Sequence, residues 1–539
     1  MAENRNRISE VLWWGLLLLQ LYPVWSVEHL LTQDGPLHFY SAHVFLELWR
    51  GESPVIAHLF EFSLHASPNW IGPILFIAAQ ALTGPLLAEK LVVTLIMVSM
   101  AGGYRYLLSG WGCQVLSARF LIFPFLLSHY LVMGLYPFLL GVGCSLFVAG
   151  YYFRSREMLR GWKLVWCSVL VTCNYFCHLI PAAITGILLL LVPAAEVLAG
   201  KISRRQWLED TVKVIGTGVP SFLLAVWFLS GGSGEPVAWN LNVREYLHGL
   251  VSMSWVTPFT NSPLPWMMLW LVVMTLLGSW MLWQKFKRKG WQTDEIWLAL
   301  AVLVLVLKVI IPEGPRGGSL ISYRLTLFFW MAVSVWFALT GVKALAPRYW
   351  YLLVSTVVLV GVCQPIHMAH HMKIVSDTYA ECVPAFESIP PHSEAMLFGF
   401  NLNGEREGAP VVAPRNQLFT HCYQKAAMLQ DDIGVSTHFQ AEYDLFPIRF
   451  KQREMTGYFA GAYDEAPQDF PLGTYLQAGS KAEHLQVVVL AGQAGHDLPR
   501  RSPLSSGLAD WAAESRGWET SIGPMEVILL KDPKKKSVP

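Results

Sequence analysis

Residues 11–38, which read VLWWGLLLLQLYPVWSVEHLLTQDGPLH, decide the fold expected for this chain. The apolar run over residues 11–27 approaches the roughly 20 residues that a membrane-spanning helix needs. It follows Arg5 and Arg7 as a signal peptide would, yet no small-residue cleavage site comes after it, so we interpret it as a retained first span. The turn Gln33-Asp34-Gly35-Pro36 comes shortly afterwards and places a carboxylate just outside the membrane.

The composition extends this pattern to most of the chain. Of 539 residues, 54% are hydrophobic and only 14% are charged, and the mean hydropathy is +0.40. Soluble globular domains carry about 25% charged residues, so a purely soluble protein is excluded. The net charge is +1 and the basic residues stand in short clusters between apolar runs, a pattern that does not favour nucleic-acid binding. The eight cysteines form no C-x-x-C pair, so they indicate no zinc site.

Apolar runs of membrane-spanning length recur up to about residue 363 and predict a polytopic α-helical membrane protein. We expect about eleven spans, at residues 11–27, 87–104, 120–135, 137–153, 163–179, 181–199, 211–230, 265–284, 294–312, 325–341 and 348–363. A shorter apolar stretch over residues 70–84 is interrupted by Pro73 and closed by Gly84 and Pro85. It is either a twelfth span or a half-inserted helix.

The distribution of Lys and Arg decides between these two interpretations, because loops on the cytoplasmic side collect basic residues. If residues 70–84 do not cross, the cytoplasmic segments carry seventeen Lys and Arg and the opposite loops carry four. If they do cross, every later loop changes sides. We therefore expect eleven spans, a cytoplasmic N-terminus and an outer position for everything after Cys363. Compact loops and the lack of recognisable sorting signals favour a bacterial inner membrane, in which the outer side is the periplasm.

Residues 364–539 differ in composition from the predicted transmembrane domain, residues 1–363. Pro, Asp, Glu and His return, and short β-like runs stand at 395–400, 485–490 and 525–530. We expect a soluble mixed α/β domain on the outer side. Cys382 and Cys422 would both lie in an oxidising space there, which allows a disulfide without establishing one.

The first outer loop, residues 28–69, concentrates polar side chains. Asp34 stands at its opening turn, and His38, His43 and Glu47 follow on an expected amphipathic helix along the membrane surface. A carboxylate at the mouth of a membrane cavity suits general-base work on an acceptor hydroxyl or amine, or the binding of a divalent metal ion beside a phosphate. The structural alternative is that Asp34 only closes a turn or caps a helix.

Basic residues gather in a second outer loop, between the ninth and tenth expected spans. Arg316 lies in a Gly/Pro-rich segment and Arg324 at the start of a span, and their guanidinium groups match the oxygens of a phosphate or pyrophosphate. Lys308 is a third cation at this depth, although its place one turn from the end of its span favours snorkelling to the interface.

Further polar side chains are expected at outer turns on the same side as Asp34. His129 and Tyr136 border the turn between the third and fourth spans, and His178 lies between the fifth and sixth. They line a cavity together with Asp34, or they belong to the aromatic belt at the membrane interface. For each residue taken singly the belt is favoured.

This layout resembles the GT-C class of integral-membrane glycosyltransferases, which includes the protein O-mannosyltransferases and the bacterial aminoarabinose transferases. The resemblance covers most of residues 1–363. It rests first on a span followed by an outer loop that opens with Asp34-Gly35-Pro36-Leu37-His38, and on the half-helix from Pro73 to Gly84. It rests also on Ser128-His129-Tyr130 before Tyr136-Pro137, and on the late loop from Pro312 to Arg324. Many members carry two adjacent acidic residues where this chain has Asp34-Gly35.

The resemblance implies transfer of a sugar from a polyprenyl-phosphate-linked donor to a lipid, glycan or protein acceptor on the outer face, with inversion if the acceptor attacks opposite the phosphate. Asp34 would be the base or a metal ligand with His38 as its helper, and Arg316 and Arg324 would hold the lipid phosphate. The rivals are a transporter or flippase and a non-catalytic envelope assembly protein. No visible repeat supports transport, and eleven spans exceed what an anchor needs.

Overall fold

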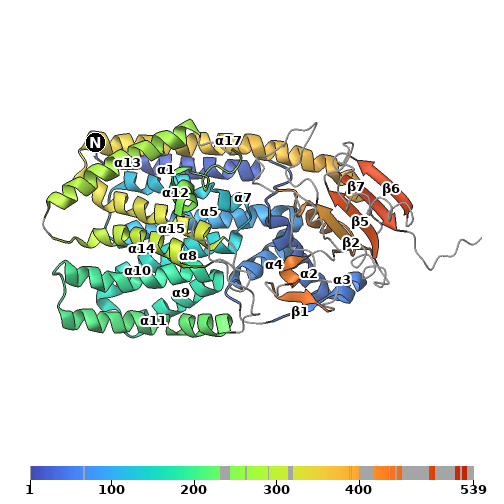
Figure 1. Cartoon of the computed structure of the whole chain (residues 1–539), viewed down its shortest axis with the longest axis horizontal. Coiled ribbons are helices and arrows are strands. Elements are labelled where there is room, and N and C mark those ends of the chain that lie inside the picture. Colours follow the sequence, from blue (N-terminus) through green and yellow to red (C-terminus); the bar gives the residue numbers. More distant parts are fainter. Residues whose placement is uncertain are drawn as a thin grey trace, which may run out of the picture.

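The computed structural model describes residues 2–64, 67–230, 243–260, 264–288, 290–312, 320–387, 389, 391–399, 418–435, 438–442, 446–451, 485–491, 516–522 and 525–530. A bundle of long helices occupies one end of the molecule and the β-strands lie at the other (Figure 1). The N-terminus lies at the end of the bundle that is far from the strands.

Eight helices in the described part of the chain are long and apolar enough to cross a membrane. They include α1 (Ala2–Trp25), α5 (Pro85–Gly110), α8 (Tyr136–Ser155), α10 (Leu179–Leu198), α11 (Arg204–Ser230), α13 (Pro265–Lys287), α15 (Ile321–Trp336) and α17 (Pro347–Glu387). Two shorter apolar helices, α9 (Trp162–Cys177) and α14 (Ile296–Ile310), pack against α8 and α15 respectively. Ten of the eleven expected spans fall on these helices.

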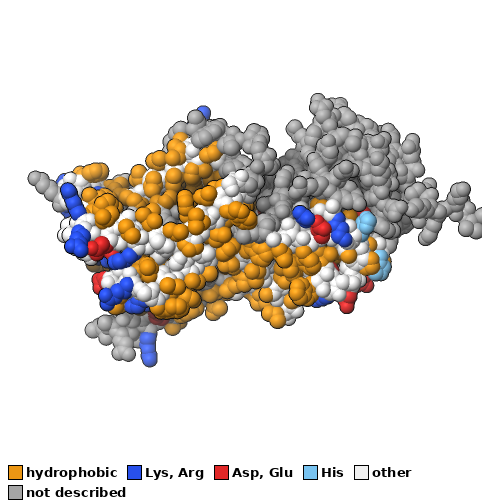
Figure 2. All heavy atoms as spheres, turned by 90° about the horizontal axis from the view of Figure 1, so that it is seen from below, with side chains coloured by type: hydrophobic (Ala, Val, Ile, Leu, Met, Phe, Trp, Pro, Cys, Tyr) orange, Lys and Arg blue, Asp and Glu red, His pale blue; other side chains and the backbone are white. Residues whose placement is uncertain are grey.

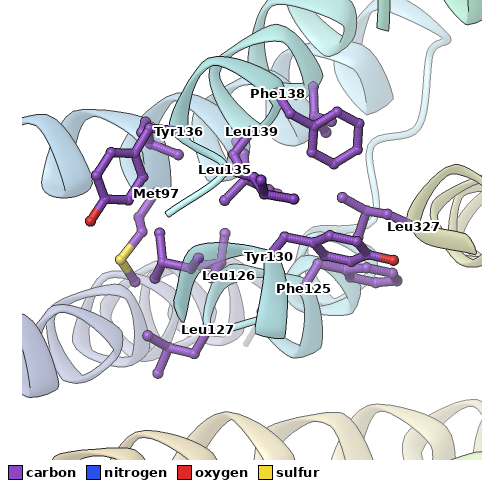
Figure 3. Close-up of a cluster of buried hydrophobic side chains, with 14 of the residues drawn as sticks. Met97, Phe125, Leu126, Leu127, Tyr130, Leu135, Tyr136, Phe138, Leu139 and Leu327 are labelled. Atoms are coloured by element: carbon purple, nitrogen blue, oxygen red, sulfur yellow. The ribbon is translucent and has the colours of Figure 1, made fainter. Parts of the chain in front are cut away.

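The remaining expected span, residues 120–135, is not one continuous helix. It consists of the short pieces η1 (Leu116–Ile122), α6 (Phe123–Leu126) and α7 (His129–Val132). These pieces still join the two ends of the bundle, because Arg119 pairs with Glu10 of α1 at one end and the Val132 carbonyl accepts from the Gln33 N–H at the other. Every side chain from 120 to 132 is buried (Figure 3), and irregular backbone is tolerated at membrane depth only inside protein.

Charged side chains collect at the end of the bundle that holds the N-terminus, whereas broad hydrophobic surface covers its middle (Figure 2). Five ion pairs join helix ends and loops there: Arg105 and Arg119 with Glu10, Arg156 with Glu196, Lys285 with Glu295, and Lys343 with Asp294. These basic residues are among those that the sequence assigns to cytoplasmic loops. Their common end lies opposite Asp34.

The first outer loop folds into α2 (Gly35–Arg50), α3 (Pro54–Leu59), the short strand β1 (Phe60–Phe62) and α4 (Ile71–Thr83). With 13 residues, α4 is shorter than a bilayer crossing. Residues from the C-terminal part cover much of α2, a contact that the sequence did not predict. Tyr40 of α2 donates to the Ile433 carbonyl at 2.9 Å and accepts from the Val435 N–H at 2.7 Å.

The C-terminal part begins later than expected, because α17 continues through residue 363 to Glu387. All three predicted β-like runs are strands of one five-stranded sheet with the order β3-β2-β5-β7-β6. Its strands are β2 (Glu394–Gly399), β3 (Gly434–Val435), β5 (Leu485–Ala491), β6 (Arg516–Ile522) and β7 (Met525–Leu530). Cys382 and Cys422 are both buried free thiols, so the structure contains no disulfide between them.

Short elements join the C-terminal part to the first outer loop. The helix α18 (Cys422–Ala427) and the four-residue helix α19 (Phe439–Glu442) pack on α2, and β4 (Ile448–Phe450) pairs antiparallel with β1. The end of the bundle that carries Asp34 is therefore built from two segments that lie almost 400 residues apart in the chain.

Helices α5 and α8 approach each other through glycines. A Cβ atom added at Gly103 would lie 2.9 Å from the Gly143 carbonyl oxygen and 2.9 Å from Leu146 Cβ. Proline stands in the first turn of both helices, where its missing N–H costs no hydrogen bond. The two helices that begin beside Asp34 are thus held together by backbone contact.

We expect Gly103→Ala to destabilise the protein by about 1–3 kcal/mol, because the new methyl group meets backbone and a buried side chain. Thermal unfolding in detergent micelles measures the effect. Gly186→Ala on α10 is the matched control, since no atom lies within 4 Å of its added Cβ, and alanine is a better helix former than glycine by about 1 kcal/mol. Equal losses in the two variants would contradict the close approach of α5 and α8.

Candidate functional site

Asp34 stands at the N-terminus of α2, where the first outer loop meets the bundle. Its N–H donates to the Met133 carbonyl at 3.2 Å, and its own carbonyl accepts from the His38 N–H at 3.1 Å. Its side chain makes no capping hydrogen bond to α2. The structure therefore does not support the view that Asp34 only caps a helix.

Two glycines fix the path of the backbone at this turn. Gly134 has φ +74, and a Cβ atom there would lie 2.6 Å from the Gly35 nitrogen. A Cβ atom at Gly35 would lie 2.2 Å from Glu89 Oε1 and from Thr32 Oγ1. Neither position has room for a side chain, so the turn is held against α5 and the 128–135 segment by direct contact.

Arg324 is the cation that acts electrostatically on the Asp34 carboxylate. Burial raises the pKa of Asp34 to about 7, and the Arg324 guanidinium opposes this rise by favouring the carboxylate. Both residues are only partly buried, so neither is sealed inside the packed core. Arg324 lies in the first turn of α15, with its guanidinium carbon 5.8 Å from the centre of the Phe138 ring. The structure thus places within electrostatic range of each other the two residues that were predicted to have the main roles.

His38 is fully engaged in hydrogen bonds. Its Nε2 lies 3.2 Å from the Gly134 carbonyl, which can only accept, so Nε2 carries the proton and Nδ1 accepts from the Gln440 amide at 2.7 Å. Burial lowers the pKa of His38 to about 4 despite these bonds. A neutral imidazole with both nitrogens occupied suits holding Gly134 in place better than helping to transfer a proton.

The sequence analysis missed two charged residues at this site. Glu89, near the start of α5, accepts a hydrogen bond from Tyr136 at 2.8 Å and pairs with Lys425 of α18 at 2.9 Å. The side chains of Glu89 and Lys425 are 1% and 2% exposed. An acidic residue inside an apolar span was a usable signal for Glu89, whereas nothing in the sequence pointed to Lys425.

The other predicted cations have different outcomes. Lys308 is 4% exposed, and its Nζ donates to the Ser322 carbonyl at 2.8 Å and to Thr326 at 3.0 Å. It therefore packs against the first turns of α15 and does not snorkel to the interface. Arg316 lies outside the described residues.

The remaining candidates are divided between the site and its surroundings. Tyr136 lies at the site, where its hydroxyl donates to Glu89. The hydroxyls of Tyr136 and Tyr130 lie on opposite sides of the buried cluster (Figure 3). His129 contacts the Tyr323 hydroxyl at 2.7 Å, which places it beside α15, and His178 accepts from the Ile180 N–H at the start of α10. His178 lies within electrostatic range of Arg324.

His43 and Glu47 belong to the far part of α2. Glu47 accepts from Arg50 at 2.8 Å and from Ser53 at 2.9 Å, so its carboxylate closes the end of its own helix. Among the residues that the structure describes, no group of three or more His, Cys, Asp or Glu side chains is arranged to hold a metal ion.

We expect Gly134→Ala to destabilise the protein by more than Gly51→Ala. Gly51 ends α2 with φ +73, so alanine meets a similar backbone strain of about 1–2 kcal/mol at both positions. Only at Gly134 does the methyl group also meet the Asp34–Gly35 backbone. Thermal unfolding of both variants in detergent gives the difference. Equal midpoints would show that Gly134 does not clamp the turn.

Comparisons by sequence find no matching family and no matching curated protein. By structure, the chain is similar to ArnT from Cupriavidus metallidurans in the apo state, with a TM-score of 0.56, 10% identity, and coverage of 96% of this chain and 97% of that one. The same ArnT bound to undecaprenyl phosphate gives a TM-score of 0.54, 9% identity and the same coverage. Arabinofuranosyltransferase AftD from Mycobacteria matches at 0.46 and 13% identity, over 90% of this chain and 35% of its own.

The likeness to ArnT extends over almost the full length of both chains, and it includes the C-terminal part as well as the bundle. At this level of identity it establishes the shared fold. The chain accordingly has the fold of the GT-C class of integral-membrane glycosyltransferases.

Proposed function

We propose that this protein transfers a glycosyl group from a polyprenyl-phosphate-linked donor to an acceptor at the outer face of the membrane. The observation that carries the proposal is the electrostatic action of Arg324 on Asp34 at the outer end of the bundle, where both residues are only partly buried. The shared fold supports it, since one ArnT structure has undecaprenyl phosphate bound.

Asp34 acts as the general base in this proposal. Its carboxylate removes the proton from an acceptor hydroxyl or amine, which forms a bond to the anomeric carbon as the bond from that carbon to the phosphate oxygen breaks. The lipid phosphate leaves with the electron pair of that bond. Attack from the side opposite the phosphate inverts the anomeric configuration.

Arg324 acts on the leaving group. A guanidinium offers forked N–H donors that match phosphate oxygens, and Arg324 lies close enough to Asp34 to act on its carboxylate electrostatically. Lys308 adds a buried positive charge beside the first turns of the same helix. The hydrophobic surface of the bundle leaves the lipid chain in an apolar environment (Figure 2).

The same arrangement suggests how the protein sits in the membrane. The basic helix ends and loops lie at the end of the bundle opposite Asp34, and cytoplasmic loops collect basic residues. The N-terminus is then cytoplasmic, and Asp34 and the C-terminal part are periplasmic in a bacterial inner membrane. The side chains of residues 120–132 are all buried inside the bundle, which favours a site at the outer face over a transport path.

Asp34→Asn should lower the transfer rate about 10²–10⁴-fold without weakening donor binding, because it removes the base and keeps the shape. Turnover of a panel of polyprenyl-phosphate sugars by protein in nanodiscs measures the effect. Asp377→Asn, at an exposed carboxylate of α17, is the control and should retain full activity. Undiminished transfer by Asp34→Asn would remove Asp34 from the mechanism.

Arg324→Ala should raise the donor KM about tenfold or more, because it removes a charge-assisted contact to the phosphate. Arg449→Ala removes an exposed arginine that pairs with Glu61 and should leave KM unchanged. A donor KM that stays at the wild-type value in Arg324→Ala would assign the phosphate to other residues.

The rate of transfer should rise with pH through about pH 7, since the base must be deprotonated and burial raises the pKa of Asp34 to about 7. Arg324 favours the carboxylate and so keeps the pKa of Asp34 lower than burial alone would make it. Arg324→Ala should therefore move the ascending limb of the pH–rate profile to higher pH. Rates measured at saturating donor between pH 5 and 9 test both statements. An ascending limb that stays in place or moves to lower pH in Arg324→Ala would contradict the electrostatic action of Arg324 on Asp34.

A further inference from the structure

We propose that Lys425, in α18 of the C-terminal part, is a positioning residue for Asp34 and acts on it through Glu89. The catalytic half of this inference rests on the proposed function. The structural half concerns the Asp34 turn itself and can be measured without any turnover.

The first step is the ion pair between Lys425 and Glu89. Lys425 Nζ lies 2.9 Å from Glu89 Oε2, with both side chains almost completely buried. The pair joins the start of α5 to a helix more than 330 residues further along the chain. A charge removed from water in this way needs its partner, so Lys425 holds the Glu89 carboxylate in one place.

The second step leads from Glu89 to the Asp34 turn. Tyr136 donates to Glu89 Oε1 at 2.8 Å. Thr32 then donates to the Tyr136 oxygen at 2.8 Å or directly to Glu89 Oε1 at 3.3 Å. Thr32 Oγ1 in turn accepts from the Gly35 N–H at 3.2 Å. Each hydroxyl donates toward the carboxylate, so the chain of bonds has one direction from Gly35 to Glu89.

The third step is steric. Glu89 Oε1 occupies the space where a side chain at Gly35 would stand, since a Cβ atom there would lie 2.2 Å away. A shift of the Glu89 carboxylate would therefore move the turn or open a gap beside it. The second link from the C-terminal part, from Gln440 through His38 to Gly134, holds the other side of the same turn.

Stability alone gives a weaker account of the ion pair. Well-packed apolar side chains often replace a buried ion pair without loss of stability. Here an apolar pair would leave the Tyr136 and Thr32 hydroxyls without a carboxylate to accept from them, so the Gly35 N–H would lose its orientation. The particular contribution of Lys425 and Glu89 is the position of the turn that carries Asp34.

Hydrogen–deuterium exchange tests the structural half. In Lys425→Met the peptide covering residues 30–38 should exchange about tenfold faster than in the wild type, because the bonds that hold it are weakened. Lys373→Met removes a lysine from an exposed ion pair with Asp377 and should leave this peptide unchanged. Unchanged exchange of residues 30–38 in Lys425→Met would overturn the proposal.

Kinetics test the catalytic half. Lys425→Met should lower kcat about 10–100-fold with donor KM within about threefold of the wild type, since a misplaced base slows the reaction without removing the phosphate site. Lys425→Arg keeps a cation and should recover most of the loss. A fall in kcat matched by an equal rise in KM, or no recovery with arginine, would contradict positioning.

The double variant Glu89→Gln/Lys425→Met separates positioning from folding. It removes both charges and keeps an acceptor for Tyr136, so its thermal stability should exceed that of Lys425→Met while kcat remains low. Full recovery of kcat would reduce the pair to a structural role and overturn the proposal. If the wild type turns over no donor but the exchange result holds, the proposed function fails and the positioning of the turn stands.

Discussion

The end of the bundle that carries Asp34 depends on the close contact between the Asp34 turn and Gly134. Near the membrane, backbone N–H groups need partners within the protein, and those of Gln33 and Asp34 find them in the carbonyls of Val132 and Met133. The contact is possible only because the segment that supplies these carbonyls is not a regular helix. The broken path of residues 116–135 is thus what allows a carboxylate to be held at the end of the bundle.

Electrostatics then give the carboxylate its properties. Lys425 is paired with the Glu89 carboxylate, while Arg324 acts on Asp34 from α15. The Lys425–Glu89 pair is almost completely buried, whereas Asp34 and Arg324 are only partly buried. The two are connected through Tyr136 and Thr32, so the C-terminal part belongs to the site even though none of its residues was predicted there.

Local patterns in the sequence predicted much of this fold. Apolar runs located ten of the eleven expected spans, and β-like runs located three strands, because these signals lie within single elements. Pro124, Ser128 and Gly134 interrupt the expected span at 120–135, and the prediction from apolar content alone did not take them into account. Asp34, a turn residue, and Arg324, a residue at the start of a span, could be singled out from the sequence because each stands at the end of a local pattern, and their roles stay predictions. The covering of α2 and the Glu89–Lys425 pair depend on contacts between segments far apart in the chain, and no periodicity records them.

The most direct test of the account is a cryo-EM structure of the protein in nanodiscs with a polyprenyl phosphate bound. We expect phosphate density within hydrogen-bonding distance of the Arg324 guanidinium, on the side that faces Asp34. The lipid chain should leave along the hydrophobic surface of the bundle. Phosphate bound at the opposite, basic end of the bundle, or at the outer end without contact to Arg324, would contradict it.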